Sequence, residues 1–484
     1  MTNVRILHPL VVAVAAACAL GACTVGPDYR RPDLETPAAF KENQGWTIAA
    51  PADDVPRGKW WQFYGDADLD ALQDAAAASN QSVAQAEASY RAATTLVDAA
   101  RANYFPVVSA DASLIRSSRG GGSSASRATN SNATRSVSLA ASWEVDLWGR
   151  VRRQVEAQRA TADASASDLA GVKLATQAAL AANYFQLRQI DTQKQLLDDT
   201  LTAYQRTLDV TRNRYAGGVS ARVDVAQAET QLKTTQVQAI DLGVARAQLE
   251  HAIALLVGKP ASTFSIPVKR WTAFDEKRAP AVPLTGLPSQ LLERRPDIAG
   301  AERRVAAANA QIGVAKAAYF PSIGLSAQGG FSSLSASDLF SLPNRFWSIG
   351  PALAQTLFDG GLRRAQTEQA IAIYDANVAA YRQTVLSGFA EVEDQLAALR
   401  ILEQEGAAQD DVLASARKSL ALTLNQYKAG TVSYINVVTV QATALANERN
   451  AVSIFGSRMI ASVGLVRTLG GGWSTGETAP SATR

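Results

Sequence analysis

The sequence predicts a mainly helical protein with a smaller β component, built as two copies of one unit in which two strands precede a very long helical hairpin. The Tyr-Phe-Pro motif at residues 104–106 returns at 319–321, and Tyr215, before a Gly-Gly pair, returns as Tyr427 before Gly430. The matches keep one order and one spacing of roughly 210 to 215 residues, which indicates an internal repeat. Alternating apolar and polar residues precede each helical stretch, and residues 149–215 contain no proline.

The amino-terminal residues resemble a secretion signal. Arg5 supplies a positive start, and the apolar run at 10–20 is too short to span a bilayer comfortably. The run ends in Leu-Gly-Ala-Cys at 20–23, which resembles a bacterial lipobox. We therefore expect a signal peptide over 1–22 and acylation of Cys23, with an N-acyl and a diacylglycerol lipid and an outer-membrane destination. The alternative is an ordinary signal peptide with an incidental cysteine.

Composition argues against catalysis and against a polyanionic partner. The chain has 47 basic and 44 acidic residues, so no field for nucleic acid is predicted. His251 is the only histidine after residue 22, and it lies in a helical pattern that favours packing. We find no phosphate loop, paired metal ligands or nucleophile motif. The sequence predicts no enzyme, no catalytic residues, no metal site and no cofactor besides the lipid.

Each copy is predicted to open with a helix. An extended, proline-rich arm is expected over 23–70, and helix formers dominate 71–102. Pro106 ends this helix because it lacks an amide proton and disfavours helix at the preceding residue. In the second copy, Pro296 followed by an acid suits a first helical turn.

Strands are predicted next. Residues 136–147 alternate between an apolar and a wettable face, and 107–115 is the expected antiparallel neighbour. The second copy repeats this at 322–331 and 346–357. Each strand has about ten residues, the length that a tilted membrane strand needs. Three tryptophans suit an interfacial belt: Trp143, Trp148 and Trp347. The alternative is a soluble pair of hairpins with one face on a helix layer.

Long helices follow the strands. Helices are expected at 149–215 and 222–257 in the first copy, and the second copy returns at 434–469. Gly217-Gly218 and Gly430 interrupt the helices. A seam with steps of three and four residues indicates coiled-coil packing through Leu197, Leu201, Tyr204, Leu208, Thr211 and Tyr215. The resulting domains are two repeats at 71–258 and 289–469, a proline-rich connector at 259–288 with a short strand around 265–268, and a tail at 470–484.

Four strands per chain imply partners. Backbone amides cannot face lipid unpaired, so membrane strands must close into a barrel, and single-chain barrels use at least about eight strands. Two or three chains must therefore share one barrel. The strand count favours three chains only if the product is a water-filled conduit.

The chain resembles the outer-membrane factor (TolC-like) family, especially the lipoprotein efflux branch typified by OprM. The matching segments are residues 23–29 (CTVGPDY), 60–61 (WW), 291–298 (LLERRPDI), 319–321 (YFP) and 357–361 (LFDGG). The resemblance implies a homotrimer with a twelve-strand β-barrel continued by a twelve-helix α-barrel in the periplasm. It also implies a periplasmic adaptor (membrane fusion protein) and an inner-membrane pump, most often of the resistance-nodulation-division type.

The resemblance also assigns roles at the helical bends. The family docks its adaptor at these tips, here Gly217, Gly218, Val219, Gly430 and Thr431. Beyond the tips the family places acidic residues that constrict the bore. Asp224 matches that pattern, whereas Asn436 and Thr439 stand where aspartates are common, so the gate is expected to be less acidic. Tyr215 and Tyr427 are candidates to bond across the closed helices. The alternatives are that Asp224 stabilises a helix start and that the tyrosines only pack.

The predicted function is the outer-membrane channel of a tripartite efflux pump, which passively conducts drugs or other toxic small molecules. Within transport, the alternatives are the outlet of a type I protein secretion system and a metal-export system. From another class, the alternative is a lipid-anchored periplasmic coiled-coil structural protein, which leaves the four amphipathic strands unexplained.

Overall fold

The computed structural model describes residues 24–34, 37, 39–42, 59–118, 131–275 and 294–471. The chain divides into two compact units. The first contains residues 1–33, 89–165 and 300–382, and the second contains 34–88, 166–299 and 383–484. Within the described ranges, no helix has both the length and the hydropathy that a membrane-spanning helix needs.

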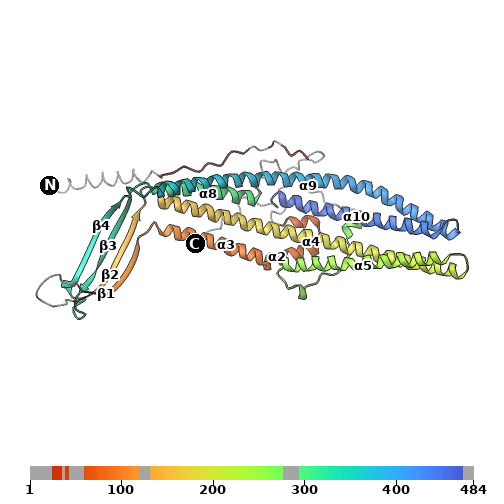
Figure 1. Cartoon of the computed structure of the whole chain (residues 1–484), viewed down its shortest axis with the longest axis horizontal. Helices are drawn as coiled ribbons and strands as arrows, with labels where there is room; N and C mark the ends of the chain where they lie inside the picture. The colour runs from red at the N-terminus through yellow and green to blue at the C-terminus, as the bar shows by residue number, and fades with distance from the viewer. Residues whose placement is uncertain are drawn as a thin grey trace. The chain divides into compact units, whose positions relative to one another are not determined.

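The first unit holds one antiparallel sheet in the order β1-β2-β3-β4 (Figure 1). The strands are β1 (Val107–Ser118), β2 (Ser131–Val145), β3 (Ser322–Ser333) and β4 (Arg345–Ala354). All four predicted strands are therefore confirmed. The two copies join through β2 and β3, where Val137 is paired with Phe331 and Trp143 with Leu325.

The apolar face of this sheet is exposed. Leu139 is 61% exposed and Ile349 is 75% exposed, although both project from the predicted apolar face. The soluble alternative required helices of the same chain to cover that face, and the described chain does not do so. A contiguous exposed apolar face of this kind marks a surface for lipid or for another protein.

β2 and β4 end two and three residues before the predicted 147 and 357. At the end of β2 the cause is Asp146, whose carboxylate accepts the backbone N–H groups of Val151 and Arg152 at 3.0 and 2.9 Å. These are among the first amides of the following helix, which lack partners within that helix. Asp146 therefore starts the helix instead of continuing the strand.

The helix predicted over 71–102 is in fact two helices, α2 (Ala67–Ser79) and α3 (Gln81–Ala102), so a single helix was wrong. They meet at Asn80, whose backbone is extended. The Asn80 side chain accepts the N–H of Val83 at 3.0 Å and donates to the Leu256 carbonyl at 2.7 Å. Asparagine is a favoured helix cap because its side chain replaces a missing helical partner. The matching helix of the second copy, α8 (Pro296–Ala317), begins at the predicted proline.

The long helices are confirmed. They are α4 (Arg150–Ala216), α5 (Arg222–Leu256), α9 (Leu362–Ala429) and α10 (Tyr434–Thr468). In the second unit, α4 and α5 form one hairpin and α9 and α10 form the other, with both bends at the same end (Figure 1). Leu197, Tyr204 and Leu208 of the predicted seam are buried. Tyr215 is 47% exposed, so its assignment to the seam was wrong.

An aromatic core lies between the two hairpins of the second unit. It contains Trp60 and Trp61 of the short helix η1 (Trp60–Tyr64), Tyr184 and Phe185 of α4, and Trp271. Phe185 stacks on Trp271 with ring centroids 5.8 Å apart. The described connector adds only the short helices η2 (Ala261–Thr263) and α6 (Thr272–Asp275).

The strand predicted around 265–268 is wrong, because charged side chains satisfy the backbone there. The N–H of Ile266 donates to Glu250 at 2.5 Å, and the Ile266 carbonyl accepts Arg246 at 2.7 Å. Arg188 donates to the Pro267 carbonyl at 3.0 Å. Once these groups are paired, a second strand is not needed.

We predict that Asn80→Ala loosens the junction of α2 and α3. The substitution removes a cap and leaves the Leu256 carbonyl without its donor, which costs about 1 to 2 kcal/mol locally. Amide exchange around residues 81–84 rises by about fivefold to thirtyfold, measured by mass spectrometry. Ser82→Ala, an exposed change on the same helix, leaves exchange unchanged, and equal exchange in the two variants would contradict the capping role.

Candidate functional site

The bends of the two hairpins share one backbone design. Val219 N–H donates to the Arg214 carbonyl at 2.9 Å, and Thr431 N–H donates to the Gln426 carbonyl at 3.0 Å. Gly218 and Gly430 adopt φ of 72° and 80°, which residues with a side chain rarely adopt. The helices α4 and α9, which occupy equivalent places in the repeat, therefore both end in the same glycine-terminated turn.

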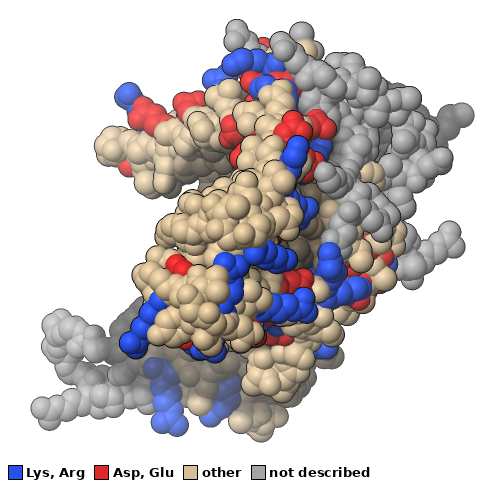
Figure 2. Space-filling view, turned by 90° about the vertical axis from the view of Figure 1, so that its right-hand side faces the viewer, with Lys and Arg blue, Asp and Glu red and all other residues tan. Residues whose placement is uncertain are grey.

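The predicted docking residues all lie on the surface. Gly217, Gly218, Val219, Gly430 and Thr431 are exposed, and Val219 is 69% exposed. Figure 2 shows this end of the molecule, where Lys and Arg are prominent on a largely uncharged surface. Between residues 418 and 447 the second hairpin carries two exposed lysines, Lys418 and Lys428, and no acidic residue. The tip of this hairpin therefore presents positive charge.

Asp224 is held by the bend itself. Its carboxylate accepts the Ser220 hydroxyl at 2.6 Å and the backbone N–H of Ala221 at 3.2 Å. Because α5 begins at Arg222, this carboxylate caps the helix start and lies at its positive end. The equivalent residue of the second copy is Asn436, which is exposed, as is Thr439 one turn later.

The two equivalent tyrosines have different surroundings. Tyr427 is 4% exposed, and its ring meets Tyr434 edge to face with centroids 5.4 Å apart. The Tyr427 hydroxyl lies 3.2 Å from the Thr211 hydroxyl of the other hairpin. Tyr215 is exposed, and the first-copy counterpart of Tyr434 is Arg222, which offers no ring. Of the two tyrosines, only Tyr427 lies between the hairpins.

Sequence reasoning missed a charged contact between the hairpins. Arg214 of α4 donates to the carbonyls of Tyr427 and Lys428 at 3.0 and 3.2 Å, and its guanidinium lies 4.9 Å from the Tyr427 ring centre. These carbonyls end α9, where the helix dipole is negative and favours a cation. The sequence signal is a difference between the two copies: Arg214 of the first copy has an uncharged counterpart, Gln426, in the second.

Burial disfavours ionisation of the Tyr434 hydroxyl at this junction. Tyr434 is 2% exposed, and burial, followed by the nearby Tyr427, raises the pKa of its hydroxyl well above the ordinary value. Leu208, Ala228 and Val437 pack around the two rings, so all four long helices contribute to one small core near the bends. The bends are therefore joined by a dry, neutral cluster and by one charged clamp.

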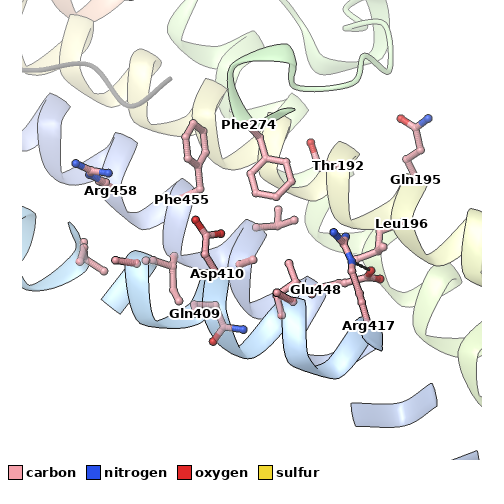
Figure 3. A pocket seen from close by; sticks show the side chains of 18 of the residues that line it. Thr192, Gln195, Leu196, Phe274, Gln409, Asp410, Arg417, Glu448, Phe455 and Arg458 are labelled. Atoms are coloured by element: carbon pink, nitrogen blue, oxygen red, sulfur yellow. Dashed lines mark hydrogen bonds and ion pairs between the residues drawn. The ribbon is translucent and has the colours of Figure 1, made fainter. Parts of the chain in front are cut away.

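Farther from the bends, the surface of the hairpins is concave. A groove of about 730 Å³ runs between α4, α9 and α10 beside Phe274 (Figure 3). Phe274 meets Phe455 edge to face with centroids 5.5 Å apart, and Arg417 pairs with Glu448 at 2.8 Å. The groove thus combines apolar surface with charges that neutralise each other. Among the described residues, no group of three or more His, Cys, Asp or Glu is placed to hold a metal ion.

Cys23, the expected lipidation site, lies outside the described residues. The described chain begins at Thr24, and the backbone N–H of Val25 donates to the Trp148 carbonyl at 3.1 Å. Trp148 lies in the turn after β2, and its indole stacks on Phe320 with centroids 4.8 Å apart. The start of the arm is therefore fixed at one end of the sheet.

Comparison with known proteins gives a consistent result. The family model described as "Outer membrane efflux protein" matches residues 72–259 and 287–471. The chain is 30% identical to the pyoverdine export outer membrane protein OpmQ of Pseudomonas aeruginosa, over 96% of each chain. It is 30% identical to the cation efflux system protein CusC of Escherichia coli, over 96% of this chain and 98% of CusC. The solved outer-membrane channel OprN superposes with a TM-score of 0.83 at 29% identity, covering 93% of this chain and all of OprN.

We predict that Arg214→Gln loosens the end of α9. Losing a charged donor to two helix-end carbonyls increases amide exchange in residues 426–431 by about tenfold. Arg212→Gln is the matched control, because Arg212 pairs only with exposed Glu229 of its own hairpin, at 2.5 Å. Amide hydrogen exchange, measured by mass spectrometry in both variants, distinguishes loss of the clamp from loss of positive charge alone. A similar increase in both would show that loss of positive charge, and not the clamp, is responsible.

Proposed function

The chain belongs to the outer membrane efflux protein family, and from this premise we propose that three copies form the outer-membrane channel of a tripartite efflux pump. The predicted family and the TolC-like fold are confirmed by the family match and by the OprN channel. The relatives are outer-membrane efflux proteins, as the predicted function required. The observation that supports assembly into a ring is the sheet: among the described residues β1 and β4 each pair on one side only, and the apolar face is exposed.

Backbone pairing supports a closed ring of several copies, and the proposed water-filled channel favours three copies over two. β1 and β4 are the edges of the sheet, and their outer amides and carbonyls need partners where no water is present. Pairing β4 of one copy with β1 of the next satisfies both edges and closes a barrel. Three copies supply twelve strands, and a barrel of twelve strands is wide enough for a water-filled bore.

The four long helices of each copy would continue the bore as a twelve-helix tunnel through the periplasm. The exposed bends would dock the periplasmic adaptor, and an inner-membrane pump of the resistance-nodulation-division type would drive export. The positive second tip favours an adaptor surface with acidic side chains, because complementary charge guides association. Acylation of Cys23 would add a lipid anchor to the same chain.

The gate would lie just beyond the bends. Asp224, Asn436, Thr439, Tyr215 and Tyr427 are the candidate residues, and Arg214 joins them as the clamp between hairpins. Asp224 braces the first bend, whereas Asn436 in the second copy has no charge. A ring built from three copies therefore alternates acid and amide, which predicts a weaker pull on cations than a ring with an acid at every position.

The cargo would be drugs or other toxic small molecules, with selection made mainly by the pump. Cation export is a second candidate, because CusC is named for cation efflux. Only Met459 and His251 represent methionine and histidine after residue 22, so soft-metal cargo would pass without a relay of such ligands. A polypeptide outlet remains the third transport candidate. A coiled-coil spacer would not need the exposed apolar sheet.

Conductance tests the channel and its gate. Purified trimers of the natural sequence form pores in planar bilayers, and Asp224→Ala raises their open fraction by about twofold to thirtyfold, because a helix-start cap of about 0.5–2 kcal/mol is lost. Asp209→Ala, which removes an exposed acid of α4, leaves conductance unchanged. Protein that assembles normally yet never conducts would contradict the channel, and equal conductance of Asp224→Ala and the natural sequence would contradict the gate.

Radioactive palmitate tests the anchor. The natural chain incorporates label and Cys23→Ser does not, because only the cysteine thiol accepts the diacylglycerol. The unlabelled variant partitions less completely into membrane fractions, since each buried methylene of an acyl chain contributes about 0.8 kcal/mol. Label that persists in Cys23→Ser would place the modification elsewhere.

A further inference from the structure

We propose that the amino-terminal arm, residues 24–33, couples the acyl anchor to one end of the sheet, and that Arg153 is the positioning residue that pins the arm. The inference rests on the proposed acylation of Cys23. It adds a mechanical role to the arm: the anchor and the sheet would enter the membrane at one fixed level, and not as two loosely linked parts.

The arm begins in close contact with the turn after β2. A Cβ atom placed on Gly149 would lie 2.8 Å from Cγ2 of Thr24, so only a glycine fits beneath Thr24. The adjoining backbone bond from Val25 to Trp148 fixes the direction of the arm. Because successive Cα atoms are about 3.8 Å apart, residue 23 is attached within one residue of this contact.

Arg153 holds the arm from the first turns of α4. The Arg153 side chain is only 5% exposed. It donates to the Asp28 carboxylate at 2.9 Å and to the Val25 carbonyl at 3.4 Å, while Glu156 accepts at 2.8 Å. A buried guanidinium is costly unless its charge is paired, and here the arm supplies one of the two paired carboxylates.

Close packing reinforces the pin. A Cβ on Gly313 of α8 would lie 2.8 Å from Cγ of Arg153, and a Cβ on Gly26 would lie 2.5 Å from Cα of Gly313. The arm, α8 and the Arg153 side chain are thus stacked without room for a methyl group. Release of the guanidinium would remove both the ion pair and this packing.

The remainder of the arm follows the same helices. Asn309 of α8 donates to the Pro27 carbonyl at 2.9 Å, and the Tyr29 hydroxyl donates to Glu302, two turns earlier on α8, at 3.1 Å. Arg31 donates to the Tyr381 hydroxyl of α9 at 3.0 Å. The arm is therefore seated along its described length, and its position is not set by the lipid alone.

The end of the sheet at which the arm starts also carries aromatic side chains. Phe105, Trp148, Phe320 and Phe358 lie within four residues of the adjoining ends of β1, β2, β3 and β4. Phe105 is 68% exposed and Phe358 is 89% exposed. Aromatic side chains at the end of the apolar face of a sheet are typical of the interface between lipid and water. The arm thus delivers the anchor to the level at which these rings would meet lipid headgroups.

The test is a double-mutant cycle in cells that express the full chain. The four proteins are the natural sequence, Arg153→Met, Cys23→Ser behind a leader removed by the general signal peptidase, and the double variant. Arg159→Met, an exposed change on the same helix, is the control. Palmitate incorporation reports acylation, tryptic cleavage after Arg30 reports release of the arm, and the rate at which heat-modifiable oligomer appears reports insertion.

The expected result depends on the anchor. Arg153→Met speeds cleavage after Arg30 by at least about tenfold, because charge-assisted bonds to the arm are lost. In acylated protein it slows oligomer formation by at least about threefold, and in Cys23→Ser protein by less than about 1.5-fold, since no anchor remains to be positioned. Arg159→Met changes neither rate.

Equal slowing in both backgrounds would overturn the coupling, because Arg153 would then act on helix packing alone. Unchanged cleavage after Arg30 would overturn the pin. Absence of palmitate on the natural sequence would refute the acylation on which the coupling rests, and the cleavage comparison would still decide whether Arg153 holds the arm.

Discussion

Backbone pairing along the outer edges of β1 and β4 constrains every other part of this molecule. Within the described chain each edge has a hydrogen-bonded neighbour on one side only, and the same sheet leaves Leu139, Ile349 and Leu353 exposed. In water such a sheet invites aggregation, and in lipid its edges must be closed. The proposed ring would meet both demands, because copies of one chain would cover one another's edges while lipid would cover the apolar face.

The two copies of the repeat have diverged where their hairpins meet. Tyr427 packs on Tyr434, whereas its counterpart Tyr215 is exposed beside a bend that has Arg222 at the corresponding place. Asp224 braces the first bend, and Asn436 replaces it in the second. Arg214 reaches from the first hairpin to the end of α9, whereas its counterpart Gln426 has no charge. In the proposed ring, a partner would therefore meet two kinds of tip in alternation, one bearing the Arg214 clamp and the other accepting it.

The elements were predictable where the cause is local, and not where it is distant. Glycine at 218 and 430, proline at 296 and alternation in the strands fix conformations within a few residues, so these boundaries could be predicted from sequence. The break at Asn80 lies in an alanine-rich stretch, and its reason is a bond to Leu256, far away in the chain. The absence of a strand at 265–268 likewise depends on side chains of α4 and α5. At the site, the bends and Tyr427 were predictable, but the Arg214 clamp depends on how the two hairpins pack.

The described amino-terminal arm, which follows the proposed acylation site, is part of the fold. Residues 24–33 are held in the first unit by α4, α8 and α9, and farther along Phe40 is buried in the second unit against Val392 and Leu396 of α9. There the backbone amides of Lys41 and Glu42 both donate to Glu393, at 2.7 and 2.9 Å. A flexible tether would leave the anchor free to sample many depths, and its contribution would fall as its length grew. An arm seated on helices would remove that freedom before insertion begins. The helical scaffold, and not the strands, would then determine where acyl chains on Cys23 meet the membrane.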